Sequence, residues 1–567
     1  MLLFLSHAIL VARFSDLIKT GNGPVELTRI LSAAAILLSS LIIIYSAACF
    51  SSLLLKNSLP AIICTPFLLL FGLLLVTPLT IFLFLVSPNV YVFSFLLLPV
   101  SIALFPVFSF LTWQRAIVKD VSSRKIIFKT TVVILLISFG SHAIANLAAS
   151  RELSKALRQV KTEGIKMTPE EVIPPPIPDK DNAALIYQHA FDLAEQLKNR
   201  YKAEWEYMPY ESMVKPEEMT AEQKRIIGRI MKKPEFITFY ALIEQAVSMP
   251  ACRFDIKYEE GPSMLLPHLA KMRSMARLID ARTYILAEEE KYNAALRSAE
   301  TGLRLGDFLA DEPILISQLV RIAVDAIAVK SINRLFDRPG VIFSQNDYRN
   351  LISEIEKKDR FITKSLEGEL VLLGGWAFKR KTDFLELSQS GSLAHKTFAS
   401  FYGSYLIQPV SKRDYAVYIG ALANLNLYSR KPYFSIKDRS AEWGNTFSVD
   451  RFQSMKHIVS SMTLPALSRL IEQQAKHNAC LDSSKLGIAI KIYRTRYGKY
   501  PGVLSSIIPE ILPELPLDPF TGKDYIYRRE GKGFIVYSIG PNEKDNGGIF
   551  DGKHQDKYDD IVFKVTN

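Results

Sequence analysis

The sequence has few of the residues, and none of the short motifs, from which metal sites and catalytic sites are usually recognised. Its 567 residues include four cysteines and eight histidines, without the Cys-x-x-Cys or Cys/His spacing typical of structural zinc. A Gly-rich phosphate loop, a G-x-G-x-x-G motif, an H-E-x-x-H motif and a G-x-S-x-G motif are also absent. These absences argue against zinc and against the enzyme classes that carry such motifs, so we expect a protein without catalytic activity.

The four cysteines have two kinds of surroundings. Cys49 and Cys64 lie inside apolar runs, whereas Cys252 and Cys480 lie in the charged part of the chain. In an oxidising compartment Cys252 and Cys480 could form a disulfide. Their wide separation in sequence favours the alternative, two buried free thiols.

Charged residues are almost missing from the first part of the chain. Between Leu31 and Trp113 the only one is Lys56. A helix needs about 20 mainly apolar residues to cross a bilayer, and the segments that meet this requirement are residues 31–55, 60–86, 90–113 and 130–147. The sequence therefore predicts a multi-pass α-helical membrane domain over residues 1–150, with the lipid bilayer as a partner.

The orientation of this domain follows from the loop between its third and fourth segments. Against the single Asp120, the loop carries the cationic residues Arg115, Lys119, Arg124, Lys125 and Lys129. Such a loop faces the cytoplasm by the positive-inside rule, which places the chain after residue 150 outside it. We predict a protein of the cell inner membrane with an extracytoplasmic region, although Arg151 and Lys155 oppose this orientation.

The formal net charge of +12 does not indicate a nucleic-acid partner. Residues 1–150 hold nine Lys/Arg and three Asp/Glu, and the remaining 417 residues hold 60 and 54. Half of the excess therefore flanks the apolar segments, where cationic residues set topology. The other half is spread thinly, so no nucleic acid is predicted to bind.

Residues 151–460 are dense in charge and are predicted to be mostly α-helical. Pro174 to Pro178 cannot continue a helix, and Asp181 and Asn182 after them are typical helix N-caps. Residues 265–335 follow the period of consecutive amphipathic helices, with turns near Glu290 and Pro313. Part of this stretch resembles one tetratricopeptide hairpin, but no second copy follows at that period. A generic helical hairpin is therefore favoured.

Residues 461–567 are predicted to form a small α+β module. An apolar helical pattern runs from about Leu464 and stops at Tyr497 to Pro501, and short alternating segments follow at residues 525–528, 534–538 and 560–565. One long helix can cover a three-stranded antiparallel sheet of this size. The predicted fold class is thus a multi-pass helical membrane domain, a mostly α-helical soluble region and this α+β module.

The module resembles the globular domain of type II secretion major pseudopilins. The matching positions occur in the same order and are Tyr493, Gly498, Tyr500, Pro501, Leu517, Asp518, Pro519, Phe520, Tyr525, Tyr527, Arg528, Phe534, Tyr537, Ser538, Gly540, Asp559, Asp560 and Ile561. Pseudopilins carry a cleavable leader and one apolar helix directly before this domain. Neither precedes it here, so polymerisation by their route is not expected. The whole chain also resembles uncharacterised bacterial membrane proteins with such a tail, which implies no activity.

The resemblance implies a calcium site in the loop after the second strand, because calcium prefers oxygen ligands from carbonyls and carboxylates. The residues offered there are Asn542, Asp545, Asp551, Asp556, Asp559 and Asp560. Asn542 stands where the resemblance implies an aspartate, so one ligand charge is missing. A solvated acidic loop without metal is the alternative.

Together these features predict a non-enzymatic, membrane-anchored cell-envelope protein that binds another protein, in connection with a secretion or pilus-like assembly. The first alternative is a membrane-bound hydrolase whose site lies between the helical region and the tail. The second is a transporter, for which His142 and Asn146 in the fourth segment are the candidate polar residues.

Overall fold

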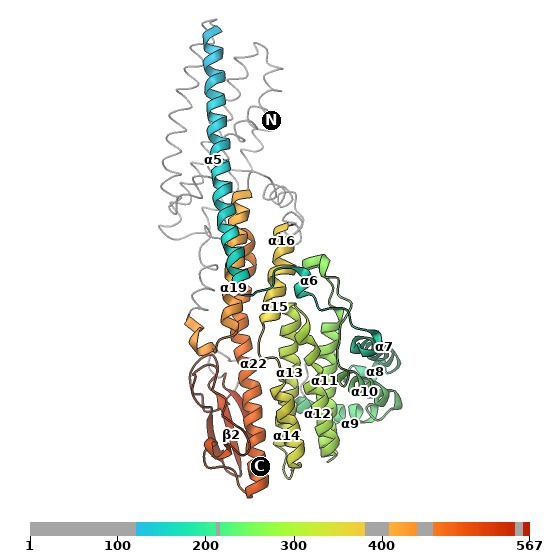
Figure 1. Ribbon diagram of the computed structural model, residues 1–567. Helices are drawn as coiled ribbons and strands as arrows, with labels where there is room; N and C mark the ends of the chain where they lie inside the picture. Colours follow the sequence, from blue (N-terminus) through green and yellow to red (C-terminus); the bar gives the residue numbers. More distant parts are fainter. Residues whose placement is uncertain (1–120, 211–215, 380–407, 439–456, 550–558, 567) are drawn as a thin grey trace, which may run out of the picture. The chain divides into compact units, whose positions relative to one another are not determined.

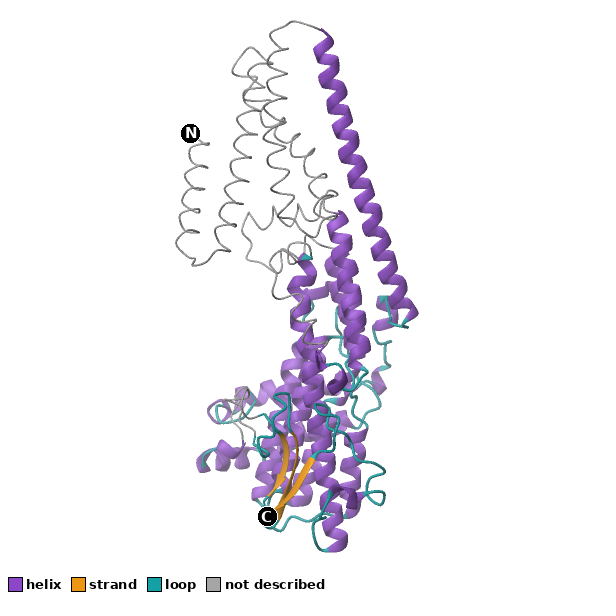
Figure 2. Cartoon of the chain, turned by 90° about the vertical axis from the view of Figure 1, so that its left-hand side faces the viewer, coloured by secondary structure: helices purple, strands orange, loops and turns teal. Residues whose placement is uncertain are grey.

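The computed structural model describes residues 121–210, 216–379, 408–438, 457–549 and 559–566. By its internal contacts the chain forms two compact units. Unit 1 comprises residues 1–152 and 400–413, and unit 2 comprises residues 153–399 and 414–567. The described residues are mostly helical and include a three-stranded antiparallel sheet (Figure 1, Figure 2).

The elements are named in chain order. The α-helices are α5 (Val121–Thr162), α6 (Pro169–Val172), α7 (Ala183–Arg200), α8 (Lys202–Trp205), α9 (Ala221–Ile230), α10 (Pro234–Val247), α11 (Pro267–Glu288), α12 (Tyr292–Leu305), α13 (Leu315–Phe336), α14 (Gln345–Glu356), α15 (Thr363–Gly368), α16 (Gly375–Lys379), α19 (Gln408–Ser429) and α22 (Ile458–Tyr497). The 3-10 helices are η1 (Asp179–Asp181), η2 (Pro216–Glu218), η3 (Tyr258–Ser263), η4 (Asp307–Asp311), η7 (Tyr433–Ser435) and η8 (Leu504–Ile507), and η5 (Glu369–Gly374) is a π-helix. The strands are β1 (Ile526–Glu530), β2 (Gly533–Ser538) and β3 (Ile561–Val565).

Among the described helices, none combines the length and the apolar character that crossing a bilayer requires. The predicted membrane segments at residues 31–55, 60–86 and 90–113 lie outside the described residues. The fourth, residues 130–147, lies in α5, where Ser141, His142 and Asn146 interrupt the apolar residues. The predicted multi-pass membrane fold is therefore wrong on this finding. The inner-membrane localisation that depended on it is contradicted as well.

Polar residues of α5 hold the start of α19 within unit 1. The Lys412 ammonium donates hydrogen bonds to Asn146 Oδ1 at 2.8 Å and to Ser150 Oγ at 2.9 Å. The Arg413 guanidinium donates to both carboxylate oxygens of Glu152, each at 2.9 Å. Asn146, a candidate transport residue in the sequence, thus has a structural role in joining two helices.

Two large hydrophobic cores lie in the helical part of unit 2. In the first, α7, α9, α10 and α11 pack through buried residues such as Phe191, Ile227 and Phe239. In the second, α12, α13 and α14 pack against α22 and the sheet through residues such as Ile332 and Leu351. Burying one such side chain contributes about 1.5–3 kcal/mol. The two cores together fix the relative positions of the helices within unit 2.

The sheet lies against α22 and follows the predicted meander. β2 pairs with β1 and with β3, in both cases antiparallel. The helix ends at Tyr497 because Gly498 adopts a left-handed conformation with φ of 73°. Within α22, a Cβ on Gly487 would lie 2.1 Å from a ring carbon of Phe563. That glycine costs about 1 kcal/mol of helix propensity relative to alanine, and it lets β3 approach the helix.

Candidate functional site

The loop after β2 holds the residues that were predicted to bind calcium. Asp551 and Asp556 lie outside the described residues. Asp545 Oδ1 accepts one hydrogen bond from the Tyr537 hydroxyl and one from the Gly547 N–H, both at 2.8 Å. The Asp545 carboxylate therefore fixes the path of the loop against β2.

Asp559 and Asp560 also accept hydrogen bonds from the loop backbone. Asp559 Oδ2 accepts from the Asn542 N–H at 3.1 Å, and Asp560 Oδ2 accepts from the Gly548 N–H at 2.7 Å. Over the described ranges, three or more acidic, histidine or cysteine side chains nowhere come together as a metal site. The four described members of the set do not form the expected calcium site by themselves, so calcium binding stays a prediction.

Asp560→Ala is expected to lower the free energy of unfolding of the module by about 1–3 kcal/mol, because it leaves the partly buried N–H groups of Asn546 and Gly548 without an acceptor. Asp560 is fully buried. The loss measured by urea unfolding of the full-length protein in a chelator reports these hydrogen bonds, and the same measurement in millimolar calcium tests the predicted metal site. Asp524→Ala, at an exposed position, is the control. A loss confined to calcium-containing buffer would instead identify Asp560 as a metal ligand.

Charged side chains converge between the helical part and the tail, where the hydrolase alternative requires a site. Lys358, just after α14, places its Nζ 2.8 Å from Asp325 Oδ1 and 2.6 Å from Asp307 Oδ1. Its ammonium also donates to the Leu303 carbonyl. From α22, His477 Nε2 lies 3.5 Å from Asp325 Oδ2. The cluster thus joins η4, α13 and α22.

Burial decides what this cluster can do. The side chains of Lys358, Asp325 and His477 are 2%, 0% and 1% exposed. Burial opposes the charge of Lys358, but the two carboxylates outweigh it and raise its pKa. Burial lowers the pKa of His477 to about 3, so the imidazole is neutral. Because a substrate cannot reach these groups, the cluster stabilises the packing of α22 and gives the hydrolase alternative no support.

A second buried polar group has the composition of a catalytic triad but the wrong order. His268 Nε2 lies 2.9 Å from Glu312 Oε1, and the Ser317 hydroxyl donates to Glu312 Oε2 at 2.5 Å. Phe254 stacks on the imidazole with 4.2 Å between ring centroids. In a nucleophilic triad the histidine stands between serine and carboxylate. Here the carboxylate stands between them, so the histidine cannot activate the serine.

The two cysteines of the charged region are free thiols in unit 2. Burial raises the pKa of Cys480 to about 12, and it also raises the pKa of Cys252. A thiol must ionise to act as a nucleophile or a metal ligand. Both cysteines are therefore packing residues, as the favoured interpretation of the sequence had it.

A groove lined mostly by cations lies between α9 and α11, and we call it the basic groove. It has a volume of about 600 Å³, and its lining residues are Lys224, Arg225, Gly228, Arg229, Lys232, Lys233, Ile285, Glu288 and Glu289. Five positive and two negative side chains give it a formal charge of +3. It is open to solvent and accessible to a partner.

The two glutamates of the basic groove already have cationic partners. Lys232 Nζ lies 2.6 Å and Lys291 Nζ 2.8 Å from the Glu289 carboxylate. Hydrogen bonds from these two lysines lower the pKa of Glu289. Arg338 lies 2.5 Å from Glu288. The negative charges of the groove are therefore satisfied within the protein.

Three cations of the basic groove have no such partner in the described part of the chain. Arg225, Arg229 and Lys233 are exposed, and none forms an ion pair with a described residue. Arg225 and Arg229 stand four residues apart on α9, a spacing at which like charges repel by about 0.2–0.5 kcal/mol, and Lys233 follows the end of this helix. Beneath them the floor is apolar, because Gly228 lies against the buried Ile285. An anionic partner with an apolar side chain would relieve the repulsion and cover the floor.

Sequence reasoning missed the basic groove because its cations look like an ordinary solvated helix face. One signal was present: residues 223–233 contain five cations and no acidic residue. That signal gives no indication of the apolar floor, which Ile285 supplies from α11. A groove formed by two helices that are distant in sequence requires the tertiary structure.

The likeness of residues 461–567 to pseudopilins rests on the sequence positions given above, and it stays a prediction. The three-stranded sheet beside one long helix is a simple arrangement that many proteins could reach independently. Comparison of the chain with family models, with curated proteins and with solved structures found no match.

Proposed function

We propose that this is a non-enzymatic binding protein, and that the basic groove holds an acidic peptide segment of a partner protein. The observation that carries the proposal is the set of three exposed cations, without ion-pair partners among the described residues, above an apolar floor. Charge complementarity of this kind speeds encounter and selects partners. The absence of catalytic motifs from the sequence and the inaccessibility of the buried clusters are consistent with a role in binding.

The chemistry of the groove favours a peptide over a nucleic acid. Glu288 and Glu289 interrupt the cations that line the groove, so the groove offers no continuous track of positive charge for a phosphate backbone. Ile285 offers an apolar contact that a phosphate backbone cannot use. A segment that alternates acidic and aliphatic side chains satisfies both features.

Reversal of the three unpaired cations, in the triple variant Arg225→Glu, Arg229→Glu and Lys233→Glu, is expected to abolish peptide binding. The probe is a fluorescent synthetic peptide of alternating glutamate and leucine, titrated against the full-length protein. For the unaltered protein we expect binding that weakens by about tenfold or more between low and physiological salt, because exposed charges are screened. A single-stranded oligonucleotide of equal charge is titrated in parallel.

The control is a triple variant with the same change in net charge at exposed positions away from the groove: Lys180→Glu, Lys202→Glu and Lys532→Glu. It should bind the peptide as the unaltered protein does. If both triple variants lost the same peptide affinity, the binding would depend on the net charge of the protein and not on the groove. Tighter binding of the oligonucleotide than of the peptide would assign the groove to nucleic acid and refute the proposal.

A further inference from the structure

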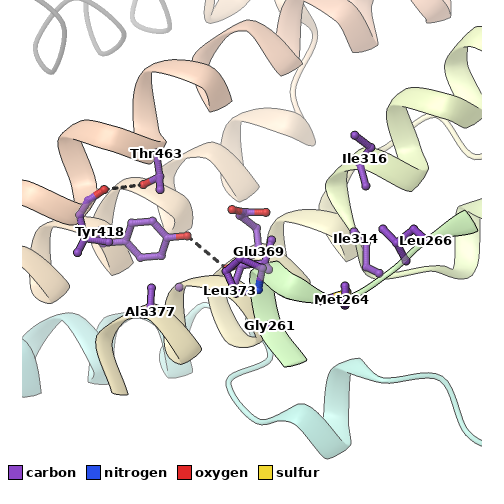
Figure 3. Close-up of a pocket in the computed structure, with 13 residues that line it drawn as sticks. Gly261, Met264, Leu266, Ile314, Ile316, Glu369, Leu373, Ala377, Tyr418 and Thr463 are labelled. Carbon is purple, nitrogen blue, oxygen red and sulfur yellow. Dashed lines mark hydrogen bonds between the residues drawn. The ribbon is translucent and has the colours of Figure 1, made fainter. Parts of the chain in front are cut away.

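A second cavity in unit 2, which we call the Glu369 cavity, is mostly apolar and has a single ionisable carboxyl. Its volume is about 280 Å³. Aliphatic side chains including Leu266, Ile314, Ile316 and Leu373 line it, together with Glu369, Tyr418 and Thr463 (Figure 3). At roughly 30 Å³ for a water-sized group, it has room for on the order of ten non-hydrogen atoms.

One wall of the cavity is a π-helix that begins at Glu369, and two glycines let its neighbours approach it closely. A Cβ on Gly368 would lie 1.7 Å from the Pro313 carbonyl oxygen, and one on Gly374 would lie 2.1 Å from the Tyr418 ring. Single π-helical turns occur frequently at functional sites. Two close packing contacts therefore hold the π-helix beside α13 and α19, with Glu369 at its first position.

Among the residues that the structure describes, the Glu369 carboxyl has no partner. The residue is only 8% exposed, and over the described ranges no cation or hydrogen-bond donor contacts the carboxyl. Figure 3 shows it in the space between Tyr418 and Thr463 on one side and Ile316 on the other. Burying an ionisable group without a partner is costly. A leucine at this position would avoid that cost. The presence of a glutamate is explained if a ligand pairs with its carboxyl.

The remaining polar groups of the cavity show what that ligand must offer. The Tyr418 hydroxyl donates its hydrogen to the Glu369 main-chain carbonyl at 3.3 Å, and the Thr463 hydroxyl donates its own to the Val459 carbonyl at 3.0 Å. Each hydroxyl oxygen then retains lone pairs and no free hydrogen. Together with the ionised carboxylate, the side chains present three acceptors and no donor. A primary ammonium group, with three N–H donors and a positive charge, matches this set.

We propose that the Glu369 cavity binds a small primary amine with an apolar body, whose ammonium pairs with Glu369 and whose hydrocarbon part lies against Leu266, Ile314 and Leu373. The hydroxyl oxygens of Tyr418 and Thr463 accept the remaining N–H groups. The site is separate from the basic groove and takes a different class of ligand.

Binding of such an amine depends on pH through Glu369. Burial raises the pKa of this carboxyl to about 7 in the empty cavity, and the ammonium needs the ionised form. Tyr418 of α19 is the other titratable lining residue, and its pKa lies well above the ordinary tyrosine value, first because of burial. The lining side chains from η3, α13 and α22 do not titrate. Affinity is therefore expected to be about tenfold weaker near pH 6 than near pH 8, in proportion to the ionised fraction.

The experiment titrates full-length protein with 2-phenylethylamine, with its neutral isostere 2-phenylethanol and with phenylacetate, by calorimetry near pH 8. We expect the amine to bind, the alcohol to bind about tenfold more weakly or worse, and the acid not to bind. Glu369→Gln should weaken the amine by about tenfold or more and leave the alcohol unchanged. Ala377→Leu, which fills the cavity, should weaken both.

Glu259→Gln, on an exposed residue outside the cavity, is the matched control and should retain the affinity for the amine. Alcohol binding as tight as amine binding, or amine binding unaffected by Glu369→Gln, would overturn the assignment of an ammonium ligand. Failure of all three probes to bind at millimolar concentration would overturn the cavity as a site for this class of ligand.

Discussion

Lys358→Met is expected to lower the free energy of unfolding of unit 2 by about 3–5 kcal/mol, the usual cost of removing one partner of a buried ion pair. Lys358 Nζ lies 2.8 Å from the Asp325 carboxylate, and Asp325 is 0% exposed. Without the lysine, that carboxylate stays buried in the core without an ion-pair partner, because His477 beside it is neutral. The loss should appear in the urea midpoint and in faster hydrogen exchange of α13 and α22.

A second replacement distinguishes the cost of an unpaired buried charge from the cost of losing the ion pair as a whole. The double variant Lys358→Met with Asp325→Leu should recover much of the loss, because a buried ion pair can often be exchanged for apolar residues at little cost. Lys364 supplies the exposed control, since it pairs with Asp311 at 2.7 Å and both side chains are more than half exposed. Lys364→Met should cost no more than about 1 kcal/mol. Equal losses of unfolding free energy in the Lys358 and Lys364 variants would contradict the claim that burial makes the Lys358 pair the stronger contributor.

Glu369→Gln is expected to stabilise the protein at about pH 8 by up to about 3 kcal/mol and to change little at about pH 5. The pKa of the carboxyl rises from 4.5 to about 7 on folding, because of burial. Between these values the folded state holds more protons than the unfolded state, so the free energy of unfolding falls as pH rises and stays low above pH 7. Glutamine keeps the shape of the neutral acid and removes this dependence.

The measurement is the difference in unfolding free energy between the unaltered protein and Glu369→Gln across that pH range, which cancels the titration of other groups. Glu259→Gln should show no such trend, since Glu259 is exposed. A stabilisation of the same size at both ends of the range would mean that the gain came from packing and not from proton binding. An amine that binds the cavity should reduce the difference near pH 8.

Sequence patterns predicted the local elements of unit 2 well where a single residue decides the outcome. Asn182 caps α7 by accepting a hydrogen bond from the Ala184 N–H at 3.1 Å, and Gly498 ends α22. The three alternating segments of the tail correspond to β1, β2 and β3. In these places the conformational preference of one residue, or an alternation of period two, specifies the structure without help from distant residues.

The functional features were not predictable because each depends on residues brought together by folding. Glu369 and Thr463 are distant in the chain and meet only in the cavity. Lys358 looked like any other charged residue of the helical region, although its ammonium is buried between two carboxylates. The membrane prediction is contradicted on a different ground, because none of the described helices is long and apolar enough to cross a bilayer.

The helix α22 has consequences for any attempt to divide this protein. Its first two turns supply Val459 and Thr463 to the cavity wall, its middle supplies His477, and Gly487 receives the sheet. A cut at residue 461 would thus leave the upstream helices with an open flank and deprive the tail of the start of its helix. Domain swaps, truncations and inserted tags should therefore keep residues 458–497 together with the upstream helices and the sheet, because both pack against this helix.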